Sequence, residues 1–451
     1  MDGANPLPFG VRVSYAACMR TLTALLLATL PLPAAAALTA PERKMTAIVD
    51  AEHGRSVALL EKLVNQNSGS LNIEGVTKVG EMMRTELEPL GFDVKWVPMA
   101  EAKRAGHIVA THKGNGRGKR LLLIGHLDTV FEKDSPFQAF KRLDGDKAEG
   151  PGIDDDKGGM VVIVAALRAM QAAGTLKDAD VEVVLTGDEE DVGDPVEIAR
   201  RDLIAAGKRA DVALDFEGLS VIDGQDWGSI ARRSSSSWTL RVTAQGGHSS
   251  GIFSERAGDG AIYAAAQIIA AFRKELPEQN LTYNVGLIAG GERAELDADQ
   301  IRATAAGKTN IIPQIAIARG DMRTLADEQT VRVQGKMKAI VARAFPGAKA
   351  EINFDQGYPA MAPTEGAKAL LGKLNVVNRD LGLKDMPALD PLRRGAGDIA
   401  FVAKDVDGLV GLGTSGEGSH ALGETVDLDS IKRQAKRAAI LMTRLSRERR
   451  D

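Results

Sequence analysis

Acidic or histidine residues follow the ends of several short apolar segments in this chain of 451 residues. The segments and their polar neighbours are 121–124 with His126 and Asp128, 181–185 with Asp188 to Glu190, and 212–214 with Asp215 and Glu217. A further acidic cluster, Asp154 to Asp156, lies in GPGIDDDKGG. In an α/β sheet, ligands bind at the loops that follow the C-terminal ends of the strands. If the apolar segments are strands, we expect these polar clusters to form a site there.

The region after residue 37 alternates between helical and strand patterns. Apolar residues have helical spacing over 57–64, 76–87 and 160–173, and apolar strand segments cover 92–97, 108–111, 121–124, 181–185 and 212–214. Strands separated by helices are typical of a largely parallel or mixed α/β sheet.

The pattern changes near Ala231. The order becomes β-α-β-β-α-β, with strands at 236–244, 281–288, 310–318 and 350–354 and helices at 260–274 and 327–344. This order is that of a small two-layer domain. We therefore expect an α/β domain formed by 38–230 and 359–451, interrupted by an insert at 231–358.

The first 37 residues resemble a removable export signal. Met19 and Arg20 precede the apolar run LTALLLATLPL, and four alanines follow, which is the pattern of a secretory signal peptide. An uncleaved N-terminal helix or anchor is the alternative. Residues 1–18 are polar and proline-rich, unlike a signal, which favours translation from Met19, with Met1 as the alternative. Cleavage near Ala37 would remove Cys18, the sole cysteine, and would give a periplasmic or secreted protein without disulfides.

Composition narrows the class of function. The net charge of −4 and pI of about 6.0 argue against a broad basic surface for nucleic acids. Aromatic residues make up 4% of the chain, which disfavours stacking platforms for bases. The length exceeds that of one ordinary hydrophobic core and favours two domains.

Several carboxylates that meet at one sheet edge repel one another unless a cation lies between them. Added to them, the imidazoles of His126 and His420 would give nitrogen and oxygen ligands, a set that suits zinc. The number of ligands is sufficient for two metals if one carboxylate bridges. Each cluster alone has a simpler interpretation, since DDDK also fits a solvated acidic turn and Asp128 also fits a cap of the following turn.

An ordered set of motifs makes the chain similar to a known family. The motifs are GHLDTV, GPGIDDDKGG, TGDEEDVG, DFEG, GGHSS, KTNIIP, GDMR and GSH, which together span Gly125 to His420. In this order they resemble the di-zinc metallopeptidases that include glutamate carboxypeptidase (carboxypeptidase G), aminoacylase and succinyl-diaminopimelate desuccinylase. The resemblance implies a zinc-exopeptidase-like catalytic domain with a lid and dimerisation insert.

The resemblance also implies roles for single residues. One zinc would be bound by His126 and Glu217, the other by Glu190 and His420, and Asp155 would bridge both. Glu189 matches the general base that takes a proton from the metal-bound water. Asp128 would hold the other ring nitrogen of His126.

Two positions depart from the family pattern or leave it open. Asp154 stands where the family usually has a small residue, which predicts a more acidic site. The last acidic ligand is read as Glu217, because FEG resembles the carboxypeptidase branch, but Asp215 remains an alternative.

In the insert, the resemblance assigns three residues to the substrate. His248 would stabilise the oxyanion, often from the partner subunit of a homodimer. Asn310 and Arg323 would hold the terminal carboxylate of the substrate, for which the planar guanidinium is suited. Surface pairing of Arg323 with Asp321 or Asp327 is the alternative.

The sequence thus favours an exported, zinc-dependent exopeptidase or amidohydrolase of glutamate carboxypeptidase type. Its substrate would be a small peptide or N-acyl amino acid, from which a C-terminal glutamate or similar residue is released. An N-acyl amino acid deacylase or a dipeptidase of the same family is the close alternative. An inactive two-lobed binding protein is the alternative of another class. Cobalt or manganese could replace zinc.

Overall fold

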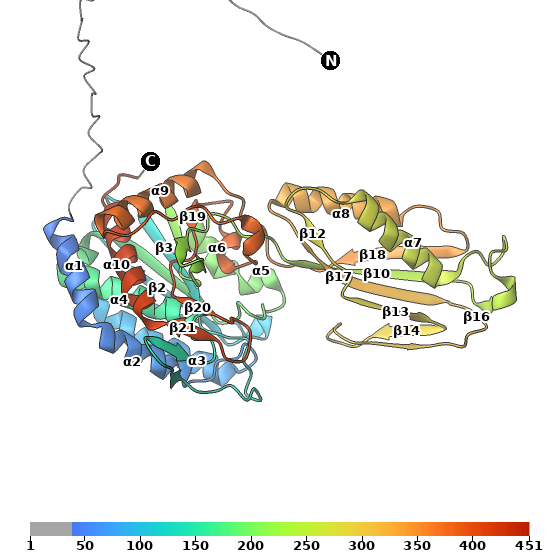
Figure 1. Ribbon diagram of the computed structural model, residues 1–451, viewed down its shortest axis with the longest axis horizontal. Helices are drawn as coiled ribbons and strands as arrows, with labels where there is room; N and C mark the ends of the chain where they lie inside the picture. The colour runs from blue at the N-terminus through green and yellow to red at the C-terminus, as the bar shows by residue number, and fades with distance from the viewer. Residues whose placement is uncertain (1–37, 451) are drawn as a thin grey trace, which may run out of the picture. The chain divides into compact units, whose positions relative to one another are not determined.

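The computed structural model describes residues 38–450 (Figure 1). The proposed signal peptide at 1–37, with Met19, Cys18 and the expected cleavage point near Ala37, lies outside the described residues. Among the helices of the described part, none has both the length and the apolar composition needed to cross a membrane.

A six-stranded mixed sheet organises the catalytic part of the chain. Its order is β1 (Asp93–Pro98), β2 (Gly106–His112), β6 (Asp180–Thr186), β3 (Arg120–His126), β7 (Val212–Asp215) and β19 (Gly408–Leu409). β1 and β2 are antiparallel to their neighbours, whereas β6, β3, β7 and β19 run parallel. The C-terminal ends of β6, β3 and β7 therefore meet at one edge, and the predicted α/β class with a mixed sheet is confirmed.

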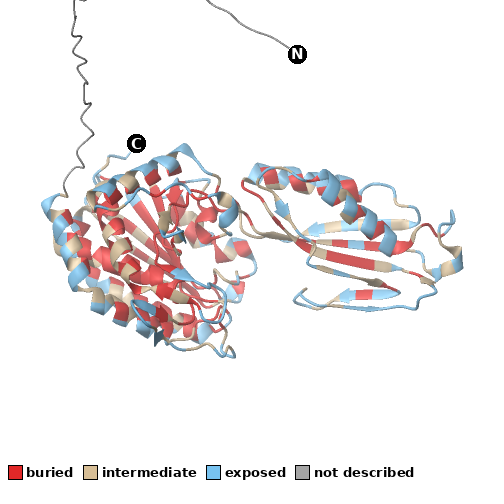
Figure 2. Cartoon of the chain, viewed as in Figure 1, coloured by how far each residue is buried: buried red, intermediate tan, exposed pale blue. Residues whose placement is uncertain are grey.

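Both faces of this sheet are buried because apolar side chains continue along the strands. Leu121 and Leu123 of β3 pack into one core with the long helices, whereas Leu122 and Ile124 pack into a second core on the other face. Figure 2 shows the strands of this sheet as mostly buried.

The helices of the first core are α1 (Ala40–Ala51), α2 (His53–Val64), α3 (Ile73–Leu87), α4 (Lys157–Ala173), α9 (Glu365–Asp380) and α10 (Leu428–Leu445). The short helices α5 (Val196–Ala199) and α6 (Arg201–Gly207) contribute Val196, Leu203 and Ala206 to the second core.

Helix α4 lies very close to the loop that follows β7. A Cβ added to Gly159 would lie 2.0 Å from the carbonyl oxygen of Phe216, so only glycine fits there. Gly174 ends the helix with φ of 75°, a left-handed conformation that glycine adopts at low cost. Gly159 thus lets the start of α4, with the acidic loop before it, lie against the end of β7.

The insert has its own sheet and its own core. Strands β12 (Thr282–Tyr283), β17 (Ile315–Arg323), β10 (Ser236–Ala244) and β18 (Ala348–Phe354) form it in that order, and β13 (Leu287–Gly291) also pairs with β17. Helices α7 (Gly260–Glu275) and α8 (Asp327–Val341) cover one face (Figure 1). The core between the layers centres on Trp238, Leu240 and Phe272.

Details of the insert differ from the sequence expectation. The strand expected at 281–288 is divided into β12 and β13. The strand expected at 310–318 begins only at Ile315 because Pro313, which has no amide hydrogen, separates the short β16 (Ile311–Ile312) from β17. A hairpin of β14 (Arg293–Leu296) and β15 (Ala303–Ala306) was not expected.

Candidate active site

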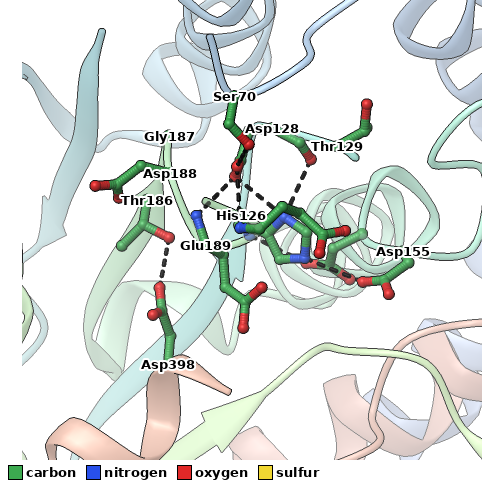
Figure 3. A network of polar contacts seen from close by, with 12 residues as sticks. Ser70, His126, Asp128, Thr129, Asp155, Thr186, Gly187, Asp188, Glu189 and Asp398 are labelled. Atoms are coloured by element: carbon green, nitrogen blue, oxygen red, sulfur yellow. Dashed lines mark hydrogen bonds and ion pairs between the residues drawn. The ribbon is translucent and has the colours of Figure 1, made fainter. Parts of the chain in front are cut away.

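The polar clusters meet at the edge formed by the C-terminal ends of β6, β3 and β7. Possible ligand atoms of His126, Glu189 and Glu217 lie within 4.8 Å of one another, and so do those of His126, Asp155 and Glu190. Figure 3 shows His126 between Asp128 and Asp155, with the Glu189 carboxylate close by. The parallel strands thus bring together residues that lie far apart in the sequence.

Asp155 lies between the two histidines. Its Oδ1 is 3.1 Å from Nε2 of His126, and its Oδ2 is 3.2 Å from Nε2 of His420. The peptide bond between Asp155 and Asp156 is cis. With one carboxylate oxygen directed at each imidazole, Asp155 connects the two histidines of the cluster.

Glu190 and His420 lie together on the other side of Asp155. Oε2 of Glu190 is 3.1 Å from Nε2 of His420. Oε1 of Glu190 is buried and has no hydrogen-bond partner within residues 38–450. His420 itself is more than half exposed, so this side of the cluster is open to solvent.

Glu217, rather than Asp215, extends into the cluster. Oε2 of Glu217 forms an ion pair of 2.6 Å with Nη1 of Arg232. Asp215 accepts the backbone amide hydrogen of Glu217 through Oδ1 and belongs to neither group of possible ligands among the described residues. The geometry thus favours Glu217 as the ligand and gives Asp215 a role in orienting it.

Asp128 has more partners than expected. The Nδ1–H of His126 donates to the backbone carbonyl of Asp128 at 3.1 Å, whereas the carboxylate Oδ1 is 3.4 Å from Nδ1. The carboxylate accepts the amides of Glu189 and Glu190 at 2.9 and 3.1 Å and the hydroxyl of Ser70 (Figure 3). Because a carbonyl only accepts, Nδ1 carries a hydrogen, and Nε2, which faces Asp155, is the ring nitrogen that could bind a cation.

Glu189 is held by its backbone on both sides. Its amide donates to Asp128, and its carbonyl accepts the hydroxyl of Tyr358 at 2.6 Å. Burial, together with the nearby Glu217 carboxylate, raises the pKa of Glu189 well above its usual value. A carboxyl group with a raised pKa is suited to accept and return a proton near neutral pH.

The other groups of the cluster are also strongly perturbed. Burial lowers the pKa of His126, but Asp128 and Asp155 outweigh burial and raise it well above the usual value. Burial raises the pKa of Glu190 to about 7 although His420 opposes this. The contacts with Asp155 and Glu190 raise the pKa of His420 to about 11. Strong perturbation of neighbouring acids and imidazoles is typical of functional sites.

The acidic loop before α4 is held by a residue near the C-terminus. The buried carboxylate of Glu424 accepts the backbone amides of Gly152, Asp154 and Asp155 at 3.0, 2.8 and 3.0 Å. Asp154 accepts the hydroxyl of Thr414 at 2.7 Å through Oδ1. The extra carboxylate at this position therefore belongs to a structural contact and adds no atom to the groups of possible ligands.

The three residues expected to contact the substrate lie in the insert, outside this cluster. His248 is exposed, and its Nδ1 accepts the backbone amide of Ser250. Asn310 is next to it, because β11 (Gly247–His248) pairs with β16. Arg323 lies at the other end of β17 and forms the alternative contact, with Nε 3.3 Å from Oδ2 of Asp321.

Sequence reasoning missed several buried charged residues around the cluster. Arg200 forms ion pairs of 2.6 and 2.7 Å with Asp188 and Asp398, and its Nη2 donates to the hydroxyl of Tyr358 at 2.8 Å. Arg232 and Arg394 both lie near Glu217. No local signal marked these residues, because arginine is mostly exposed and is fully buried only when it is paired.

The residues of this site fit divalent cations. Two imidazoles and several carboxylates converge, and Oε1 of Glu190, Oδ1 of Asp156 and Oδ2 of Asp215 are buried without a hydrogen-bond partner in the described part of the chain. Buried carboxylates without partners are costly, and cations relieve that cost.

Comparisons with known proteins agree with this geometry. The family model "Peptidase family M20/M25/M40" matches residues 122–444. Carboxypeptidase G2 of Pseudomonas sp. (strain RS-16) is 30% identical over 393 residues, covering 86% of this chain and 88% of that protein. Succinyl-diaminopimelate desuccinylase of Gluconobacter oxydans (strain 621H) is 25% identical over 356 residues, covering 77% of this chain and 86% of that protein.

A solved structure has the same fold. The Bacillus subtilis YXEP protein, described as a dinuclear metal binding peptidase from the M20 family, superposes with a TM-score of 0.62 at 19% identity, covering 88% of this chain and 99% of that one. The family is metal-dependent, in agreement with the converging imidazoles and carboxylates. With its fold, its metal-ligand geometry and a family match over most of its length, the chain belongs to peptidase family M20/M25/M40 and is a hydrolase of that family.

Proposed function

We propose that this protein is a di-zinc exopeptidase of glutamate carboxypeptidase type, which hydrolyses an amide bond and releases a C-terminal glutamate or a similar amino acid. Most support comes from one observation, the 30% identity to carboxypeptidase G2 over 86% of this chain. The desuccinylase relative supports the second candidate, an N-acyl amino acid deacylase or dipeptidase that uses the same residues.

In this proposal, His126 and Glu217 hold one zinc, Glu190 and His420 hold the other, and Asp155 bridges them. Bound zinc would acidify a water molecule and polarise the scissile carbonyl. Cobalt or manganese would suit the same nitrogen and oxygen ligands. The hydrogen bond from Nδ1 of His126 to the carbonyl of Asp128 supports this assignment because it leaves Nε2 for the metal.

Glu189 accepts the proton of the attacking water and passes it to the leaving nitrogen. Its place beside His126 and Glu217, and its raised pKa, support this role. The two backbone hydrogen bonds, to Asp128 and from Tyr358, hold its peptide while the carboxyl group moves the proton.

The insert supplies the remaining substrate contacts. His248 donates to the oxyanion, and Asn310 and Arg323 bind the α-carboxylate of the substrate. Nδ1 of His248 accepts an amide hydrogen, which leaves Nε2–H as the donor. Since His248 and Asn310 lie at the end of β17 opposite Arg323, we propose that they reach the active site of the partner subunit in a homodimer.

We further propose that the chain is exported and that its signal peptide is cleaved near Ala37. N-terminal sequencing of the exported protein checks this, and a mature protein that still begins at Met19 would contradict it.

The proposed function is tested with Glu189→Gln. We expect kcat to fall by about 10²–10⁴-fold, because a general base typically contributes that much. The bound zinc, measured by elemental analysis, should remain two per subunit. Glu197→Gln, on the exposed surface of α5, is the matched control and should keep full activity.

Substrates are compared as a panel of acyl-glutamates, other acyl amino acids and dipeptides. Faster hydrolysis of acyl-glutamates than of other acyl amino acids supports the carboxypeptidase assignment. Rates that depend on the acyl group more than on the released residue support the deacylase assignment. If Glu189→Gln had the same kcat as the wild type, the proposed mechanism would be refuted. Absence of hydrolysis with tight ligand binding would favour an inactive two-lobed binding protein instead.

A further inference from the structure

Arg394 is a mostly buried cation without a full partner. It lies in the loop between η5 (Pro391–Arg393) and η6 (Asp398–Phe401), and its side chain is 15% exposed. Its nearest opposite charge is Oε2 of Glu217, 3.8 Å from Nη2, which is too far for a hydrogen bond. Nε and Nη2 are buried and have no hydrogen-bond partner among residues 38–450. Burial of a charged guanidinium without hydrogen-bond partners is costly, and a bound anion would relieve that cost.

Glu217 cannot supply that anion alone. Its Oε2 is already 2.6 Å from Nη1 of Arg232, and Arg232 is itself fixed because its Nε donates to the carbonyl of Gly395 at 3.1 Å. Asp215 is a second acid here, with Oδ2 3.9 Å from Nη1 of Arg232, so two carboxylates, one of them a proposed metal ligand, face the two guanidinium groups.

A pocket adjoins this arginine. It has a volume of about 270 Å³ and is lined by Asp154, Asp155, Glu217, Arg393, Arg394 and Ser419, among others. A water molecule takes up about 30 Å³ in the liquid, so the space corresponds to roughly nine waters and is sufficient for a short acidic group. One wall carries Asp155, the proposed metal bridge, and another carries Arg394. A group bound here would thus lie beside the reacting bond.

A second cationic position lies near the same loop. Nε of Arg233 donates to the carbonyl of Arg394 at 3.4 Å, and a Cβ added to Gly395 would lie 3.8 Å from Nη1 of Arg323. Arg323 is the residue proposed to bind the α-carboxylate of the substrate. The loop at 393–395 therefore separates two sites for anions, one at Arg323 and one at Arg394.

We propose that Arg394 binds a second carboxylate of the substrate, in addition to its α-carboxylate, and so selects dicarboxylic substrates. This inference rests on the proposed function, because it assumes hydrolysis of an amide at the same metal site. The second carboxylate comes either from the side chain of the released residue, as in glutamate, or from the acyl group, as in a succinyl amide. In both cases the planar fork of arginine would meet a carboxylate through two hydrogen bonds.

The test compares pairs of substrates in which one member has the second carboxylate and the other has a neutral group in its place. The first pair is N-acetyl-glutamate and N-acetyl-glutamine, and the second is N-succinyl-alanine and N-butanoyl-alanine. We expect the wild type to favour the acidic member of one pair by about 10²-fold or more in kcat/KM, because a site that hydrogen-bonds a substrate group rejects the analogue without it. The pair that shows the preference identifies the source of the carboxylate.

Arg394→Gln should reduce the ratio of the two kcat/KM values to about threefold or less, because the bidentate contact is gone. Most of this change should come from a lower kcat/KM for the acidic substrate. If Arg394 had a purely structural role, the substitution would lower kcat/KM for both substrates equally and leave the ratio unchanged. That result would overturn the inference. Arg433→Gln is the matched control, since Arg433 lines the neighbouring larger pocket and pairs with Asp226 at 3.2 Å. It should keep the wild-type ratio.

Binding provides a readout without turnover. In the Glu189→Gln background, calorimetry should show glutamate, or succinate, bound at least tenfold more tightly than its neutral amide, and addition of Arg394→Gln should abolish this difference. If Arg394→Gln fails to fold, Arg394→Lys is used instead, because it keeps the charge but loses the planar fork. The ratio of kcat/KM for the acidic and neutral substrates should then fall about tenfold from the wild-type value. An unchanged ratio would overturn the inference. A wild type that hydrolyses none of the four substrates would refute the proposed function instead, whereas hydrolysis without any charge preference would refute only the role of Arg394.

Discussion

The hydroxyl of Tyr358, at the C-terminal end of the insert, contacts the backbone of the proposed general base. It donates to the carbonyl of Glu189 at 2.6 Å and accepts from Nη2 of Arg200 at 2.8 Å. Tyr358→Phe removes both contacts and keeps the ring, which packs edge-on against Phe401 with centroids 5.0 Å apart. The substitution therefore tests the hydroxyl alone.

The expected magnitude follows from which groups lose a partner. Nη2 of Arg200 retains the carbonyl of Asp188 at 3.0 Å, whereas no second hydrogen bond to the carbonyl of Glu189 is present within residues 38–450. Leaving one buried acceptor unsatisfied lowers the free energy of unfolding by about 1–3 kcal/mol. Because a displacement of 1 Å at a catalytic group costs up to ~10²-fold, we expect kcat to fall by about 10–100-fold with little change in KM.

The assay combines urea unfolding, followed by tryptophan fluorescence, with steady-state kinetics. Tyr283→Phe is the matched control, since its hydroxyl also donates to a backbone carbonyl, that of Phe272 at 2.9 Å, but within the insert. It should lower stability and leave kcat unchanged. If the two variants had equal kcat, Tyr358 would have no part in positioning Glu189, and the reasoning from these contacts would be refuted.

Two further predictions concern buried charges. Arg200→Met leaves the carboxylates of Asp188 and Asp398 unpaired in the interior and should cost about 3–5 kcal/mol of stability in thermal unfolding; a loss below 1 kcal/mol would contradict this. Burial raises the pKa values of Glu190 and Glu424 to about 7, above their unfolded values, so protein stripped of metal with EDTA should lose stability as the pH rises from 5.5 to 8. Saturating zinc should remove or reverse that trend in calorimetry because metal ligands bind deprotonated, and identical profiles with and without zinc would contradict the metal assignment.

The catalytic sheet could be predicted because its strands are buried on both faces. Continuous apolar segments such as 121–124 are typical of strands that are buried on both faces, and polar residues directly after them mark the strand ends. Their meeting follows from the parallel order of β6, β3 and β7. Most of the proposed metal cluster was therefore accessible from the sequence.

Elements with little apolar surface were harder to predict. The hairpin of β14 and β15 is mostly exposed, so its residues show no clear alternation. Helix α1 was missed although Thr39 and Glu42 form a capping box at its start, a signal that is short and easily overlooked.

Long-range charged contacts could not be predicted at all. Glu424 binds the amides of the loop at 152–155, and Arg200 pairs with Asp398, in each case across about 200 residues or more of sequence. No local pattern records such a pairing. Buried charges become interpretable only when the tertiary contacts that compensate them are known.

The contact between Glu424 and the loop that presents Asp155 has a consequence for synthesis on the ribosome. His420 and Glu424 both follow the insert in the sequence, so a growing chain that already contains β3, α4 and β6 still lacks one imidazole and the carboxylate that shapes the acidic loop. A growing chain would therefore complete the proposed metal site only when nearly the whole polypeptide has emerged.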